Sequence, residues 1–113
     1  MPVSNLFTGT CRAGVFDTGR TIIHLPVPES TGTRLVVDSN QLVLSREELS
    51  SSMRNSYLGR ISRLAEENGV IHVVVQAQET FHVSITPAAM AELRIGIGEP
   101  VWVSFKSTAV HLF

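Results

Sequence analysis

Short runs of alternating apolar and polar residues dominate the chain. Residues 101–106 read Val-Trp-Val-Ser-Phe-Lys, the period-two pattern of a half-buried strand. Similar runs predict strands over residues 6–12, 21–27, 34–37, 41–44, 55–64, 70–77, 80–85 and 109–113. One helix is predicted over 86–93, with Thr86 as its N-cap and Pro87 in its first turn. Many short strands and one short helix predict a mainly β fold, a small antiparallel OB-like barrel.

Turn residues separate these runs. Asn68-Gly69 is a strong hairpin signal between two predicted strands, and Asp17-Thr-Gly19 has the chemistry of a turn. Gly9 is expected to permit a bend or bulge inside the first run. The polar stretch 45–52 suits either a helical turn or a linker.

The chain also carries a weak internal repeat. Asn5-Leu-Phe-Thr-Gly9 matches Asn55-Ser-Tyr-Leu-Gly59, and the pattern of 32–38 matches that of 98–104. In this alignment Ser4 stands opposite Arg54, and Asn40-Gln41 stands opposite Lys106-Ser107, so that only the second copy keeps the cations. We divide the chain into a partial first repeat, 1–50, and a complete second repeat, 51–113; similarity of this extent also arises by chance.

Composition limits the classes of function. The 113 residues suit one domain, and 43% hydrophobic residues are enough for a packed core. A formal net charge of −1 provides no broad basic field for nucleic acid. Cys11 is the only cysteine, which excludes an internal disulfide and fits a reducing compartment. The sequence has no apolar run of ~20 residues and no secretory signal, so we expect a soluble cytoplasmic domain. Such a domain can also be one part of a longer protein.

Two kinds of chemistry find no support in the sequence. The phosphate-binding pattern Gly-x-x-x-x-Gly-Lys-Ser/Thr is absent, so we expect no ATP hydrolysis and no enzyme activity from this chain. The histidines are scattered over predicted strands and lack the spacing of a metal site: His24, His72, His82 and His111.

Three polar clusters remain as candidate binding groups. Lys106, Ser107 and Thr108 follow a strand, and an ammonium with hydroxyls on a bend can donate several hydrogen bonds to one small anion. Ser52, Arg54 and Asn55 precede another strand, and Thr86 lies in the piece Ile-Thr-Pro. Each cluster also has a purely structural explanation: a solvent-facing bend, a solvated linker and a helix cap, respectively.

Taken together, the pieces Ser-x-Arg-Asn, Ile-Thr-Pro and Phe-Lys-Ser-Thr-x-Val resemble the molybdate-binding Mop/TOBE family. Residues 44–55 and 101–113 are most similar to the C-terminal regulatory domain of molybdate or tungstate ABC-transporter ATPase subunits. The resemblance makes 51–113 a complete Mop-like oxyanion-binding repeat and 1–50 a partial one. It also implies ligand roles for Ser52, Arg54, Lys106 and Ser107, with Thr86 as a further candidate. The family often has Ser three residues after this Thr, whereas this chain has Ala89.

The resemblance further implies how such a domain acts. It would bind molybdate or tungstate, with no other cofactor, and would sense the cytoplasmic anion to control import. Its expected partners are a second copy of the chain and the ATPase and permease subunits. These would hold it at the inner membrane without direct insertion. The alternatives are a structural dimerisation module that has lost anion binding and an OB-type nucleic-acid-binding domain, which the charge disfavours.

Overall fold

The computed structural model describes residues 4–49 and 53–113 and is mainly β. It contains one short α-helix, α1 (Pro87–Leu93), and two 3-10 turns, η1 (Ser39–Gln41) and η2 (Ser107–Ala109). The strands are β1 (Ser4–Thr8), β2 (Thr10–Arg12), β3 (Val15–Asp17), β4 (Ile22–His24), β5 (Arg34–Asp38), β6 (Val43–Ser45), β7 (Asn55–Glu67), β8 (Val70–Gln76), β9 (Thr80–Ile85), β10 (Pro100–Phe105) and β11 (His111–Leu112).

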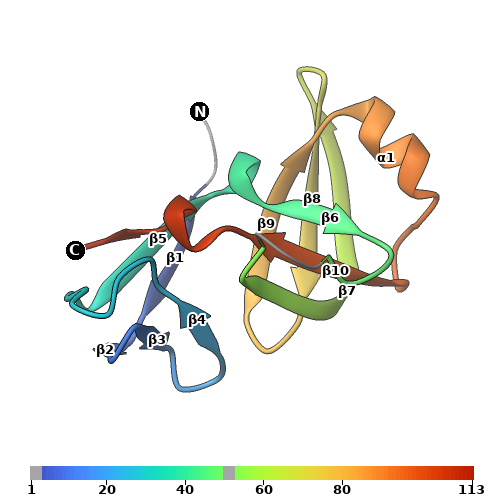
Figure 1. Ribbon diagram of the computed structural model, residues 1–113. Coiled ribbons are helices and arrows are strands. Elements are labelled where there is room, and N and C mark those ends of the chain that lie inside the picture. The colour runs from blue at the N-terminus through green and yellow to red at the C-terminus, as the bar shows by residue number, and fades with distance from the viewer. Residues whose placement is uncertain (1–3, 50–52) are drawn as a thin grey trace.

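The strands form three antiparallel sheets. A five-stranded sheet has the order β6-β10-β7-β8-β9, and two three-stranded sheets have the orders β1-β5-β11 and β2-β3-β4. Figure 1 shows the five-stranded sheet on the right and the two small sheets on the left. The predicted antiparallel β architecture with one helix is therefore confirmed. Within residues 4–49 and 53–113, however, the backbone ladders do not close into a barrel.

The two halves of the chain exchange strands. β6 comes from the first half and pairs with β10 of the second, through Val103 and Leu44 among other residues. Conversely, β11 from the end of the chain pairs with β5, through His111 and Val36. Each half therefore completes a sheet of the other, and neither sheet forms from one half alone.

Two buried asparagines bridge the sheet edges that the ladders leave open. The side-chain amide of Asn5 donates to the carbonyl oxygen of His82 at 2.9 Å and accepts from its N–H at 2.7 Å. Asn55 makes the same pair of bonds with His24, at 3.1 and 2.7 Å. An amide side chain carries both a donor and an acceptor, so it can pair with a backbone residue as a neighbouring strand would.

Aromatic and β-branched side chains fill the core between the sheets. Phe81 is fully buried and contacts Phe7 edge-on and Tyr57 in a stacked arrangement, with ring centroids 5.6 and 5.2 Å apart. The alternation predicted for 101–106 holds at Val101, Val103 and Phe105, which are all buried. Ser104 departs from this pattern: it is buried too, and its hydroxyl bonds that of Ser56 at 2.9 Å.

Glycine is required where strands pass closely. A Cβ at Gly59 would lie 2.5 Å from the carbonyl oxygen of Gln76, and a Cβ at Gly9 would lie even closer to that of Asp17. Gly9 also separates β1 from β2, as its position in the sequence predicted. Both positions therefore depend on the missing side chain for close packing.

Local sequence signals explain the helix and the main hairpin. Thr86 caps α1, its hydroxyl oxygen accepting from the N–H of Ala89 at 3.1 Å, and the helix ends at Arg94 in the left-handed region. Asn68 and Gly69 both have positive φ, at 52° and 77°, in the hairpin between β7 and β8. Among the described residues no helix has the length and apolar character that a bilayer crossing needs.

Candidate functional site

Lys106 lies on a bend at the end of β10. It has an extended backbone, with φ −77° and ψ 146°, and immediately precedes η2. The bend forms because β10 stops at Phe105 and the chain must turn to reach β11. The Lys106 side chain is exposed, whereas Ser107 is buried at 7% exposure.

The strand register brings Arg54 beside Lys106. Asn55 at the start of β7 pairs with Phe105 at the end of β10 in an antiparallel ladder. Arg54 precedes Asn55 and Lys106 follows Phe105, so both residues lie just beyond the same end of the β7–β10 ladder. Two exposed cations that are distant in the sequence therefore lie on neighbouring backbone segments.

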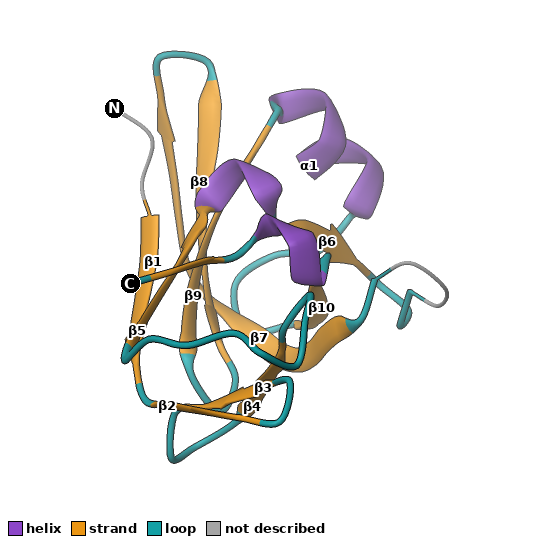
Figure 2. Cartoon of the chain, turned by 60° about the vertical axis from the view of Figure 1, so that its left-hand side comes forward, coloured by secondary structure: helices purple, strands orange, loops and turns teal. Residues whose placement is uncertain are grey.

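A pocket of about 230 Å³ lies next to these residues, where the two 3-10 turns face each other. Figure 2 shows the turns as the two short purple coils at the centre, apart from α1. The pocket is lined by Asn40, Gln41, Val43, Met53, Lys106 and Ala109. Apart from the ammonium of Lys106, its polar side chains are the two amides, each of which has an N–H₂ donor.

The amides of Asn40 and Gln41 were not among the predicted site residues. The sequence held one signal for them, because the internal alignment placed Asn40-Gln41 opposite Lys106-Ser107. In the structure these residues belong to η1 and line the same pocket as Lys106. The two turns thus line one pocket together.

The remaining predicted site residues fall elsewhere. Ser52 lies outside the described residues. Thr86 follows Ile85, which pairs with Ile71, and Ile71 pairs with Glu66 near the far end of β7. Asn55 begins β7 at the opposite end. Within one chain, Thr86 is therefore separated from Lys106 by the length of this strand, and its hydroxyl caps α1.

A hydrogen-bonded group fixes the start of β7 beside Arg54. The Tyr57 hydroxyl donates to the carbonyl oxygen of Ile22 at 2.7 Å and lies 3.1 Å from Oδ1 of Asn55. Burial raises the pKa of the Tyr57 hydroxyl above its ordinary value. Tyr57 and Asn55 together tie β7 to β4 one residue away from Arg54, which limits the movement of the backbone at the site.

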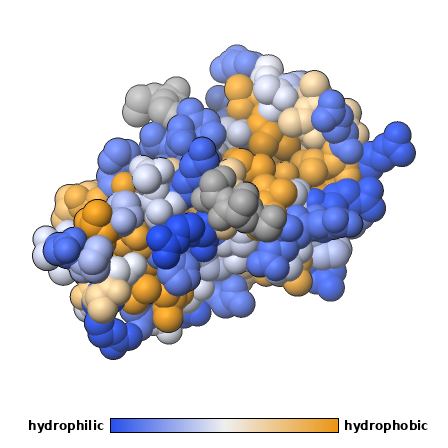
Figure 3. Space-filling view, in the orientation of Figure 1, coloured by the Kyte–Doolittle hydropathy of each residue, from blue (hydrophilic) through white to orange (hydrophobic). Residues whose placement is uncertain are grey.

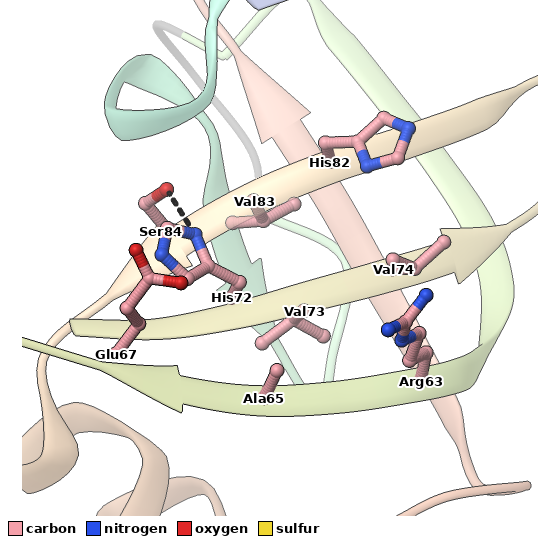
Figure 4. Close-up of a pocket in the computed structure, with 9 residues that line it drawn as sticks. All are labelled: Arg63, Ala65, Glu67, His72, Val73, Val74, His82, Val83 and Ser84. Carbon is pink, nitrogen blue, oxygen red and sulfur yellow. Dashed lines mark hydrogen bonds between the residues drawn. The ribbon is translucent and has the colours of Figure 1, made fainter. Parts of the chain in front are cut away.

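A second pocket, of about 330 Å³, lies over β7, β8 and β9 (Figure 4). It combines the cation Arg63 with the carboxylate Glu67, and His72 Nδ1 lies 3.4 Å from the Ser84 hydroxyl. A carboxylate accepts hydrogen bonds and repels anions, so this lining suits a dianion less well than the pocket at Lys106. Within the described ranges, no three His, Cys, Asp or Glu side chains are grouped to hold a metal ion.

Comparisons with known proteins agree with the fold and the predicted resemblance. The TOBE domain family matches residues 51–112. The molybdate/tungstate import ATP-binding protein WtpC of Pyrococcus abyssi is 26% identical over 110 residues, covering 96% of this chain and 32% of that protein. The protein of the same name from Pyrococcus horikoshii is 24% identical with the same coverage. The chain therefore spans about a third of the length of these curated relatives.

A solved structure shares the fold. The cytoplasmic molybdate-binding protein ModG, crystallised with molybdate bound, superposes with a TM-score of 0.73 at 19% identity. The match covers 95% of this chain and 93% of that one. Because it extends over both halves of the chain, it supports the arrangement of the three sheets as well as the region that the family matches.

Proposed function

Because this chain belongs to the TOBE domain family, we propose that it binds molybdate or tungstate in the pocket between η1 and η2. The names of its relatives support this class of ligand: one is a molybdate-binding protein, and the others are molybdate/tungstate import ATP-binding proteins. The observation that carries the proposal is the position of Lys106 on the pocket wall. The pairing of Asn55 with Phe105 puts Arg54 one residue beyond the same end of the β7–β10 ladder.

The chemistry of the lining matches the proposed ligand. Molybdate and tungstate are doubly negative and unprotonated at neutral pH, so they accept hydrogen bonds and donate none. From the lining, Lys106 would donate charge-assisted bonds, and the amides of Asn40 and Gln41 would add neutral donors. Arg54, which follows the lining residue Met53, would add a second charge-assisted donor. Ser107 and Ser52 remain proposed ligand groups, on the strength of the family resemblance. Phosphate is partly protonated near neutral pH, and the pocket would disfavour it where both amides turn their N–H₂ groups, rather than their acceptor oxygens, toward the anion.

We further propose that the domain regulates transport. In a longer protein like the relatives, it would sense cytoplasmic anion and act on ATPase and permease subunits at the inner membrane. An anion can shift a transporter toward a resting state only if it binds that state more tightly. The chain's exposed pocket gives the anion direct access to the bend at Lys106.

Pairing of two copies would complete the proposed site. Thr86 can contribute its hydroxyl proton only from a second chain, because it lies at the far end of β7 in its own. Figure 3 shows apolar surface beside α1, in the orientation of Figure 1. Ile97, a large apolar residue that follows α1, is exposed. This surface supports a homodimer.

Titration calorimetry with molybdate, tungstate, sulfate and phosphate tests the proposed ligand. We expect saturable heat with molybdate and tungstate and weaker binding of phosphate. A matched thermal-shift assay should show stabilisation that grows with ligand concentration, because binding to the folded state alone raises its stability. No heat and no thermal shift with molybdate or tungstate at millimolar concentration would rule out the proposed function.

The same apolar surface favours a second candidate, a dimerisation module without a ligand. In that case Thr86 and Ala89 serve the helix cap alone. Light scattering combined with size exclusion separates the two candidates. A dimer that forms identically with and without molybdate, together with no heat of binding, would favour the module.

A further inference from the structure

The two 3-10 turns of the chain are built alike. Asp38 precedes η1 with φ −70° and ψ 143°, and Lys106 precedes η2 with φ −77° and ψ 146°. The residues that follow the turns, Leu42 and Val110, also have nearly equal angles. A serine begins each turn, and both serines are buried: Ser39 at 1% and Ser107 at 7% exposure. By its backbone, Asp38 is therefore the counterpart of Lys106.

The asparagine bridges extend this correspondence to the strands. Asn5 bonds the backbone of His82, and Asn55 bonds that of His24, with the same two kinds of bond. The residue before each asparagine is Ser4 in the first half and Arg54 in the second. The strand-pattern alignment had placed Asn40 opposite Lys106; the backbone geometry shifts the correspondence by two residues, to Asp38.

The counterparts of the two cations contact each other. The Ser4 hydroxyl donates to Oδ1 of Asp38 at 2.9 Å. In the first half, therefore, the counterparts of Arg54 and Lys106 lie close enough for a direct hydrogen bond. The hydroxyl of Ser39, the counterpart of Ser107, is also occupied, because it bonds the Ser84 hydroxyl at 2.7 Å.

We propose that each chain has a single oxyanion site, and that the Ser4–Asp38 pair closes the equivalent position in the first half. The inference rests on the proposed function for the location of the open site. A carboxylate has no proton to donate near neutral pH and repels a dianion at short range. The first half thus has Ser4 and Asp38 where the second half has Arg54 and Lys106, and this position repels an anion instead of attracting it.

The Ser4→Arg/Asp38→Lys double variant tests this inference. Equilibrium dialysis with molybdate counts the anions bound per chain for the native protein and the variant. We expect the variant to bind one more anion per chain than the native protein. The Glu29→Lys/Thr31→Arg variant has the same change in charge at exposed residues of the loop before β5, and it should bind the native number.

The outcomes separate this inference from the proposed function. One anion on the native chain and two on the variant support both. None on the native chain and one on the variant refute the proposed site, and with it the single native site, but support the closure of the first-half position by Ser4 and Asp38. Two on the native chain, or no gain over the charge control, overturn the inference. If the double variant does not fold, Asp38→Lys alone is measured against Glu29→Lys by the same criteria.

Discussion

The side chain of Asn55 binds both backbone polar groups of His24. Its Oδ1 accepts from the His24 N–H at 2.7 Å, and its Nδ2 donates to the His24 carbonyl oxygen at 3.1 Å. Asn55 is 1% exposed, so water cannot replace these bonds. It begins β7, whereas His24 ends β4, an edge strand of another sheet. One side chain thus joins two sheets directly beside the proposed site.

Replacing Asn55 by alanine should destabilise the fold strongly. The change removes two hydrogen bonds and leaves backbone groups of His24 without partners, which we expect to lower the free energy of unfolding by about 2–3 kcal/mol. Urea denaturation measures the loss. Asn5→Ala should behave alike, and Asn40→Ala, at an exposed residue, serves as the control. A loss at Asn55 no larger than at Asn40 would show that the bridge contributes little.

The buried Tyr57 predicts a specific response to alkaline pH. Burial raises the pKa of its hydroxyl, so the folded chain keeps a proton that the unfolded chain releases near pH ~10. Above that pH the unfolded state binds fewer protons, and the free energy of unfolding falls as pH rises. Tyr57→Phe lacks this contribution. The stability difference between native protein and variant should therefore narrow between about pH 9 and pH 11.

Chemical denaturation at several pH values provides the measurement for Tyr57. At neutral pH the phenylalanine variant should be less stable by about 1 kcal/mol, because it loses the bond to the carbonyl oxygen of Ile22. A stability difference that stays constant to pH 11 would contradict the burial of an un-ionised hydroxyl.

The two cations should matter for binding and little for folding. Lys106→Ala or Arg54→Ala removes a charge-assisted donor, and we expect anion affinity to fall by roughly 1.5–3 kcal/mol. Both side chains are exposed, so urea midpoints should stay close to the native value. Arg63→Ala removes a cation from the second pocket and is the matched control for charge. Native affinity in both site variants would refute the assignment of the site.

Sequence patterns predicted the elements that depend on neighbouring residues. The helix and its Thr86 cap, the Asn68-Gly69 hairpin and most strands depend on local backbone preferences, and the structure confirms them. The turn predicted at Asp17-Thr-Gly19 also forms: it follows β3, and the Gly19 N–H donates to Oδ1 of Asp17 at 2.8 Å. The strand predicted over 41–44 begins only at Val43, because Gln41 belongs to η1.

Features that depend on contacts between residues far apart in the chain could not be predicted from the sequence. The bond between Asn5 and His82 spans 77 residues, and nothing in its neighbourhood distinguishes Asn5 as a bridge between sheets. The predicted OB-like barrel is borne out only in part: in the described portion of the chain the backbone ladders do not close, and side chains such as that of Asn5 bridge the gaps. For the site, the bend at Lys106 was locally predictable. Its approach to Arg54 depends on the register of Asn55 with Phe105.

A crystal grown with tungstate tests the central claim most directly, because tungsten scatters strongly enough to mark its own position. We predict an anomalous peak in the pocket between η1 and η2, within hydrogen-bond distance of the Lys106 ammonium. A well-ordered crystal with no peak there, or with its peak in the pocket over β7, β8 and β9 instead, would contradict the account.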